Sequence, residues 1–300
     1  MYLNYHTEMS NIHIFLKFRE LPNTKLCEKL DIYGSKDISK LVEKMNKIFS
    51  QQKQMLKKII SYRQSLVGEL TYYKNVCSKT IETNQRMVIG LGDESVFEVS
   101  ITLDHLTGVP FIPASSLKGL FKSVIFTQKI ENRELSESEI VSFQKKLEED
   151  LNSEDTDILE MQILFGTQHL KGCLIFMDTY PTEDALENSN IFELDITNCH
   201  YVSYYTGEGI PGDWENPNPV FFITVRKGIK FKFNILFDLN KWYNIREYLK
   251  TRTNTIEQIE KTIDKWINQK EIWDTLVYQA LCIYGIGAKT RLGYGTFKIL

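Results

Sequence analysis

The sequence predicts an α+β fold in which an antiparallel sheet carries helices on one face. Residues 220–225 and 229–237 have the pattern of two strands joined in a hairpin by a short turn, and the second alternates apolar and polar side chains. Residues 38–60 and 255–283 instead place apolar side chains at helical spacing. These patterns do not recur as regular strand–helix–strand units, so a parallel sheet is not expected.

The composition excludes several classes of protein. The chain has 300 residues, of which 42% are hydrophobic and 12% aromatic, so global disorder is not expected. No apolar run reaches the length of a transmembrane helix, and residues 1–10 lack the apolar centre of a signal peptide. We therefore expect a cytoplasmic protein without a membrane partner.

Cysteine spacing and the distribution of charge bear on the kinds of site that the chain can form. The five cysteines are scattered and none belongs to a C-x-x-C pair, which argues against a disulfide framework and a structural zinc site. The net charge is -3, but basic residues dominate between Ser35 and Thr80 and acidic ones between Glu131 and Glu160. Separated charge blocks allow a near-neutral protein to bind an anion on one face, although each block is also typical of a solvated helix surface.

Local signals predict the remaining elements. We expect the helix over 38–60 to pack its apolar stripe against the body or a partner subunit. Ser115 favours a helix start, and Ser136 with Glu139 forms a capping box for a helix over 136–151. Short strands are expected at 87–91, 96–103, 172–177, 192–196 and 296–299.

The strongest functional signal is the glycine loop, residues 285–295, in which four glycines surround Lys289, Thr290 and Arg291. Glycine lets a main chain approach a ligand closely, and cationic and hydroxyl side chains beside such a chain suit a phosphate. The loop is not a Walker A motif, because Ala288 separates glycine from lysine, and it lacks the βαβ unit of a dinucleotide fold. A nucleic-acid backbone is the better ligand, and a tight turn between helix and strand is the alternative.

A second candidate site lies at the predicted helix start. Ser115 and Ser116 place hydroxyls and free backbone N–H groups at a helix N-terminus, which attracts anions. Lys118 and Lys122 are four residues apart and share one side of that helix. The functional interpretation is a clamp for backbone phosphates, and the alternative is an ordinary capped helix with surface lysines.

A third candidate is the aperiodic segment 199–219, which is long for a loop in a compact domain. Its aromatic residues, Tyr204 among them, can stack on nucleobases. His200 has the chemistry of a general base for attack by a 2′-hydroxyl, although a lone histidine is more often structural. No metal-ligand spacing and no cofactor motif is present in the sequence.

The order of these motifs resembles a known family. Residues 112–119 (Ile-Pro-Ala-Ser-Ser-Leu-Lys-Gly), followed by the glycine loop, resemble the RAMP superfamily of CRISPR effector proteins. The run from 164–166 into 172–176 is similar to that family too. Residues 195–222 are similar to the sixth subunits of type III-B (Cmr) complexes. Two departures are Ala114, where the family often has glycine, and Arg291, where it often has a small residue.

The resemblance implies a ferredoxin-like, RRM-related core, and we assign it to an RNA-binding domain over 81–300. Residues 1–80 lie outside the resemblance, and we expect them to form a helical N-terminal extension. The resemblance also implies a non-catalytic subunit near the 3′ end of the guide that binds crRNA and target RNA. Its partners would be the backbone RAMP subunits, the small helical subunit and a neighbouring capping RAMP subunit. The residues we assign to RNA are Ser115, Ser116, Lys118, Lys122, His200, Tyr204, Gly287, Lys289, Thr290, Arg291 and Tyr294.

Two other functions stay open from the sequence. One is a metal-independent CRISPR repeat RNA endonuclease that uses His200 with Lys289. The other is a pure interaction module, in which the 38–60 helix and the glycine loop contact only proteins.

Overall fold

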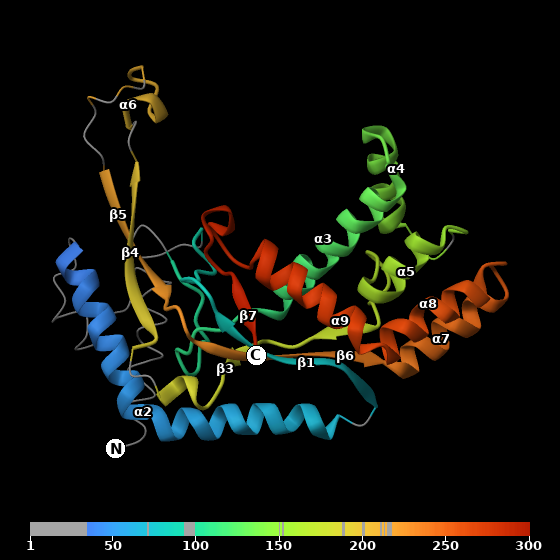
Figure 1. The fold of residues 1–300 in the computed structure, drawn as a ribbon, viewed down its shortest axis with the longest axis horizontal. Coiled ribbons are helices and arrows are strands. Elements are labelled where there is room, and N and C mark those ends of the chain that lie inside the picture. Colours follow the sequence, from blue (N-terminus) through green and yellow to red (C-terminus); the bar gives the residue numbers. More distant parts are fainter. Residues whose placement is uncertain are drawn as a thin grey trace.

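An antiparallel sheet lies at the centre of the molecule (Figure 1). The computed structural model describes residues 35–70, 72–92, 100–149, 151, 153–187, 190–199, 202–210, 212, 214 and 218–300. The strand order is β2 (Leu174–Phe176), β6 (Lys230–Asp238), β1 (Tyr73–Thr83) and β7 (Phe297–Ile299), and short β3 (Tyr180–Pro181) also pairs with β6. All these pairs are antiparallel, which confirms the predicted mixture of helices with an antiparallel sheet.

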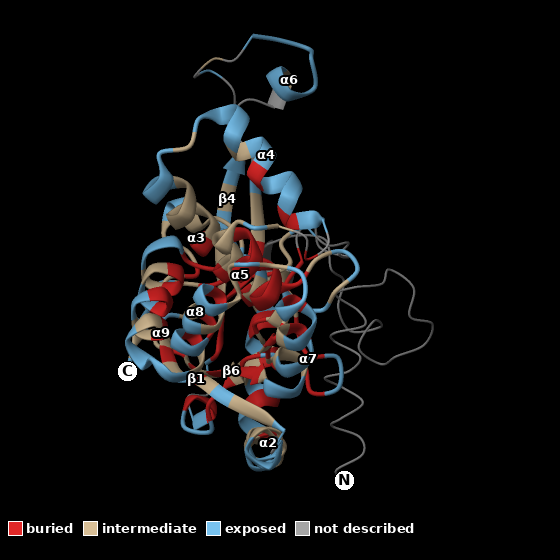
Figure 2. Cartoon of the chain, turned by 90° about the vertical axis from the view of Figure 1, so that its right-hand side faces the viewer, coloured by how far each residue is buried: buried red, intermediate tan, exposed pale blue. Residues whose placement is uncertain are grey.

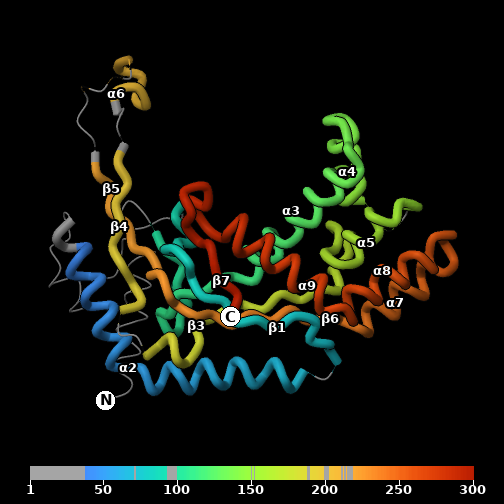
Figure 3. The backbone as a smooth tube through the Cα atoms, in the orientation of Figure 1, coloured from blue at the N-terminus to red at the C-terminus, as the bar shows by residue number. Residues whose placement is uncertain are grey.

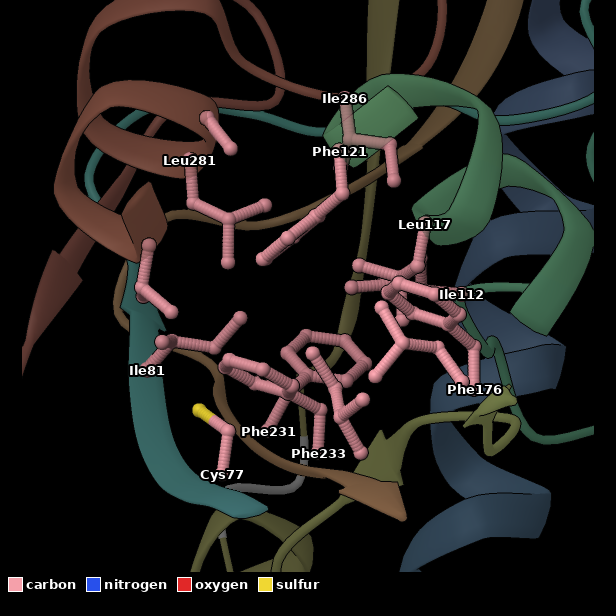
Figure 4. Packing of buried hydrophobic residues seen from close by; sticks show 14 of the residues in the cluster. Cys77, Ile81, Ile112, Leu117, Phe121, Phe176, Phe231, Phe233, Leu281 and Ile286 are labelled. Atoms are coloured by element: carbon pink, nitrogen blue, oxygen red, sulfur yellow. The ribbon is translucent and has the colours of Figure 1, made fainter. Parts of the chain in front are cut away.

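One face of this sheet carries the main core. Phe231, Phe233, Ile235 and Phe237 alternate along β6 and are fully buried. Helices α3 (Ala114–Arg133) and α9 (Lys270–Val277) and the π-helix η3 (Tyr278–Tyr284) pack with the strands. In Figure 4, side chains from the sheet and from these helices converge on one apolar cluster. Burial of each large apolar side chain stabilises the fold by roughly 1.5–3 kcal/mol.

The two strands on either side of Gly228 belong to different sheets, so the hairpin prediction is wrong. β5 (Asn218–Val225) pairs with β4 (Phe192–Cys199) in a separate two-stranded ribbon, whereas β6 pairs with β1 and β2. Gly228 turns the chain at a φ of 83° and donates its N–H to Thr83 O. Alternation along a strand reports which face is buried and not which strand is the neighbour, so the pattern alone did not exclude this crossing.

The ribbon, as we call β4 and β5, extends away from the body (Figure 1). Its tip carries the one-turn helix α6 (Val202–Tyr205). The chain leaves the central sheet after β3, runs along the ribbon and back, and re-enters as β6 (Figure 3). Part of the aperiodic segment 199–219 therefore forms the tip of a projection.

Helix α2 (Ser35–Glu69) confirms the helix predicted over 38–60 and extends beyond it at both ends. Its apolar stripe is buried against the ribbon and the 3-10 turn η2 (Ala185–Glu187). Asn46 donates to Phe192 O at 2.9 Å and accepts from Phe192 N at 3.0 Å, which ties the helix to the first residue of β4. The outer surface of α2 is exposed (Figure 2).

The predicted boundary at residue 80 falls inside β1, which begins at Tyr73. Residues 73–80 therefore belong to the central sheet and not to a helical extension. The basic residues of 35–80 favoured assigning the whole segment to a helical extension, so the first part of β1 was not predicted.

The remaining predictions had mixed outcomes. Helix α4 (Glu137–Glu148) has the predicted capping box, in which Ser136 N donates to Glu139 Oε2 at 2.9 Å. The helix predicted over 255–283 is divided, because Gln269 is extended. Strands 172–177, 192–196 and 296–299 correspond to β2, β4 and β7, whereas Met87 and Leu103 form single bridges and 93–99 lie outside the described residues. The divided helix gives α8 (Ile256–Asn268), α9 and η3, and the sequence did not predict α5 (Thr156–Phe165) or α7 (Leu239–Lys250).

None of the helices in the described part of the chain combines the length and the apolarity needed to cross a lipid bilayer.

Candidate nucleic-acid interface

The glycine loop connects η3 to β7 and lies against the segment that follows β1. Ala288 N donates to Val88 O at 2.9 Å, and Gly295 N donates to Arg86 O at 2.8 Å. A Cβ on Gly287 would lie 2.3 Å from Val88 O. This glycine also has a φ of 97°, so both space and backbone conformation require it.

Lys289 has an unusual position within this loop. Its φ is 60°, a left-handed conformation that is uncommon for a residue with a Cβ. Its ammonium donates to Thr197 Oγ1 at 3.3 Å and lies 5.4 Å from the centroid of the Phe222 ring. The half-buried Lys289 thus spans from the glycine loop to both strands of the ribbon.

A charged network joins the glycine loop, the segment that follows β1 and strand β4. Arg86 donates to Glu193 through Nε and Nη2, each at 3.2 Å, and to Asp195 Oδ2 through Nη1 at 2.9 Å. Tyr294 of the glycine loop donates its hydroxyl to the same Asp195 oxygen at 2.5 Å. The hydrogen bond to Glu193 is the largest cause that raises the pKa of Arg86. Burial, followed by the Asp195 hydrogen bond, raises the pKa of Tyr294.

Arg291 is the cation of the glycine loop that faces solvent. It lies in the 3-10 turn η4 (Thr290–Leu292), where Arg291 and Leu292 are exposed. Arg291 forms no ion pair with any residue that the structure describes. A guanidinium in this setting is available for a phosphate, which it can bind through two parallel hydrogen bonds.

The start of α3 lines a hollow to which the glycine loop does not contribute. The helix begins at Ala114, one residue before the predicted start, and Pro113 occupies the N-cap position. Asp178 accepts the Ala114 N–H at 2.7 Å and so performs the capping that we predicted for serine. Ser115 and Ser116 therefore lie in the first turn, with Ser115 exposed.

Beside this helix start is a groove of about 820 Å³, which we call the lysine groove. Ser115, Lys118, Lys171 and Lys241 contribute to its walls. Burial is the largest cause that lowers the pKa of Lys118, and the charges of Lys122 and Lys241 lower it further. These cations are therefore close enough to repel one another, which favours an anionic ligand among them.

The structure joins the two motifs through the core and separates their cations. Ile286, next to Gly287, packs toward Phe121 and Leu117 of α3 (Figure 4). No residue of the glycine loop lines the lysine groove, and Lys289 faces the ribbon instead. The glycine loop and the lysine groove are therefore two separate candidate sites among the described residues.

The third candidate is only partly described. Tyr204 lies in α6 at the tip of the ribbon, 55% exposed, with its ring 5.7 Å from that of Tyr205. Ile210 and Trp214 are each 79% exposed nearby in the chain. His200 lies outside the described residues. Within the described residues, no three His, Cys, Asp or Glu side chains gather in a group that would hold a metal ion.

From the sequence, no role was assigned to Arg86 or to Asp195. The two are separated by 109 residues, and no local pattern connects them. Lys171 and Lys241 were also missed, because each is a single lysine beside an apolar element. The available sequence signal for this tight turn was the glycine on either side of 167–171. A Cβ added to Gly166 or to Gly172 would lie within 2.6 Å of backbone atoms, so the turn requires glycine at both positions.

Comparisons with known proteins point to one family. The family model of the RAMP superfamily matches residues 80–298. The chain is 30% identical over 250 residues to the CRISPR system Cmr subunit Cmr6 of Pyrococcus furiosus, a match that covers 71% of this chain. The chain spans 65% of the length of that relative. A second relative, the CRISPR system CMR subunit Cmr6 of Saccharolobus solfataricus, is 23% identical over 90% of this chain and 74% of its own length.

A solved structure shares the fold. It is a chain in the cryo-EM structure of the Type III-B Cmr-beta bound to cognate target RNA, with a TM-score of 0.50 and 22% identity. The match covers 98% of this chain and 87% of that chain. At this identity the likeness concerns the fold alone.

Proposed function

Because this chain belongs to the RAMP superfamily, we propose that it is a non-catalytic crRNA-binding subunit of a type III-B (Cmr) complex that targets RNA. The observation that carries the proposal is the attachment of the glycine loop to the middle of the ribbon, with Arg291 left exposed and unpaired among the described residues. The likeness to Cmr6 proteins over most of this chain supports the same assignment.

The glycine loop would hold the guide strand by its phosphates. Arg291 supplies the charge, and exposed Gly287 offers main chain without a side chain in the way. Thr290 adds a hydroxyl beside them. Contacts of this kind position RNA without selecting its sequence, as a subunit that accepts many guides requires.

The ribbon would act as a projecting thumb. Its tip presents Tyr204, Tyr205 and Trp214, which are large aromatic side chains at least 55% exposed. Such rings stack on unpaired bases or cover apolar surface on another protein. The middle of the ribbon is fixed to the glycine loop by Tyr294 and Lys289. The tip therefore reaches across a guide–target duplex or to an adjacent subunit at a fixed angle from the bound guide.

The proposed partners follow from the assignment. They are crRNA, target RNA, the backbone RAMP subunits, the small helical subunit and a neighbouring capping RAMP subunit, in the cytoplasm and near the 3′ end of the guide. We also propose that the core is ferredoxin-like. In support, α3 lies between β1 and β2 in sequence, α7 to η3 lie between β6 and β7, and the sheet order is β2-β6-β1-β7. Residues 35–69 would then form an N-terminal extension attached to this core.

Charge reversal at Arg291 tests the proposal. In a complex reconstituted with guide RNA, Arg291→Glu is expected to lower guide occupancy and to reduce the log-log salt dependence of RNA binding by about one unit. The matched control is Lys261→Glu, an exposed lysine of α8 that forms no ion pair with the described residues. Equal occupancy in both variants at physiological salt would contradict RNA binding by the glycine loop.

An RNA cleavage assay on the purified chain tests whether it is non-catalytic. Purified chain incubated with CRISPR repeat RNA without metal is expected to leave the RNA intact. Cleavage that is lost in Lys289→Gln would instead support the endonuclease function.

A further inference from the structure

The lysine groove is bounded by four parts of the fold. They are the first two turns of α3, the tight turn 167–171, strand β2 and the first turn of α7, and Tyr73 at the start of β1 completes the lining. A second hollow of about 590 Å³ adjoins it and shares Tyr73, Leu170, Asp238 and Lys241. The glycine loop contributes to neither hollow.

The charge in the groove is nearly all positive. Lys118, Lys171 and Lys241 form no ion pair with any residue in the described part of the chain. Among the described residues of the lining, the one carboxylate is Asp238, whose Oδ1 already accepts the backbone N–H of Lys241 at 2.9 Å. Uncompensated cations around a concave surface favour an anion with more than one charged group.

The walls are held in place before any ligand binds. The Thr167 hydroxyl accepts from His169 N at 3.2 Å and from Leu170 N at 3.1 Å, which fixes the turn that carries Lys171. Lys241 lies in the first turn of α7, the helix that Asp238 caps. A site with fixed walls loses less entropy when it binds a ligand.

The groove also contains a surface for a planar ring. Tyr73 lines both hollows, and Tyr72, which is 73% exposed, lines the second. Asn240 and Asn244 add amide groups that can pair with the edge of a base. Phosphate groups joined to planar rings with polar edges are the chemistry of a nucleotide strand. A base can stack on tyrosine only when it is not stacked within a duplex.

We propose that the lysine groove binds unpaired nucleotides of an RNA strand, at a site separate from the glycine loop. This inference rests on the proposed function, which supplies RNA as the ligand. Lys118, Lys171 and Lys241 bind the phosphates, and Tyr73 stacks on a base. The chain therefore contacts RNA in two places, with phosphate contacts at the glycine loop and unpaired nucleotides in the groove.

The test uses the full-length chain and a fluorescein-labelled hexauridylate as probe. Lys171→Glu combined with Lys241→Glu is expected to weaken binding about tenfold and to lower the salt slope by about 1.4 units, the value for two single-strand phosphate contacts. The control pair Lys261→Glu and Lys265→Glu changes the net charge equally on exposed positions of α8. Tyr73→Leu keeps apolar bulk and is expected to weaken binding of the hexamer without changing the salt slope.

The outcomes separate this inference from the proposed function. If Arg291→Glu weakens RNA binding and the groove variants equal the control pair, the groove proposal is overturned and the proposed function stands. If neither changes RNA binding, both are overturned. Equal binding of an RNA duplex, or equal competition by polyglutamate, would also overturn it, because unpaired bases would then contribute nothing. Thermal unfolding of each variant, with neutral Lys171→Gln and Lys241→Gln beside it, identifies any loss caused by misfolding.

Discussion

Lys289 shows how a single residue links the glycine loop to the ribbon. Its left-handed backbone conformation costs about 1 kcal/mol for a side chain with a Cβ. The contacts with Thr197 and Phe222 offset this cost. The sequence marked Lys289 as a phosphate ligand, and the structure adds an intramolecular role, which leaves Arg291 as the more accessible cation.

Substitution at position 289 separates backbone strain from side-chain contacts. Both Lys289→Asn and Lys289→Val remove the contacts with the ribbon, but asparagine tolerates a positive φ and a β-branched residue does not. We expect Lys289→Val to lower the free energy of unfolding by about 1–2 kcal/mol more than Lys289→Asn. Urea denaturation of the two variants measures this difference, and equal midpoints would contradict the left-handed assignment.

At the scale of elements, a buried charge joins three helices. Glu160 of α5 accepts from Lys129 Nζ of α3 and from Trp266 Nε1 of α8, each at 2.5 Å. Glu160→Ala is expected to lower the free energy of unfolding by about 3 kcal/mol, because it leaves a buried indole N–H unpaired. Glu160→Gln, which keeps an acceptor for Trp266, should cost clearly less. Equal losses in urea denaturation would show that the hydrogen bond to Trp266 contributes little.

The carboxylate of Asp104 anchors helix α2 to the body of the molecule. Arg63 donates to Asp104 at 3.0 Å, and Tyr180 donates to the same oxygen at 3.0 Å. Burial opposes ionisation of Asp104, but hydrogen bonds from Thr107 and Arg63 outweigh it and hold its pKa below the usual range. A carboxylate with a depressed folded pKa stabilises the fold above the unfolded pKa, near 3.9, and loses that contribution as pH falls below it.

The pH dependence of Asp104→Asn follows from that direction. At pH 7 the variant is expected to be about 2 kcal/mol less stable than the natural chain. The difference should shrink as pH falls from about 4 through the depressed folded pKa. Guanidinium denaturation across this range measures it. A difference that stays constant with pH would show that the charge of Asp104 is not the source of the stabilisation.

Elements with local signals were predicted well, and those defined by distant partners were not. The apolar stripe of α2 and the capping box of α4 each depend on residues that lie only a few positions apart in the sequence. The pairing of β5 with β4, and the capping of α3 by Asp178, depend on residues far apart in sequence. The same holds for the candidate site. The glycine loop was predicted from its local sequence, but Arg86, whose carbonyl accepts from Gly295 N, was not.

At the scale of the whole molecule, buried thiols report on cooperative unfolding. Burial is the largest cause that raises the pKa of Cys77 and of Cys173, each to about 12. At pH 8 neither thiol is ionised in the folded chain, so alkylation requires unfolding. We expect both to be labelled together and after the half-buried Cys282, as followed by peptide mass spectrometry. Early labelling of Cys77 alone would show that β1 opens separately from the sheet.

The measurement that tests the central claim most directly is ultraviolet crosslinking of the assembled complex with its guide RNA, mapped to peptides of this chain. The account predicts RNA crosslinks within 285–295 that Arg291→Glu reduces and Lys261→Glu does not. Crosslinks confined to other surfaces, or protein–protein crosslinks alone at the glycine loop, would contradict it.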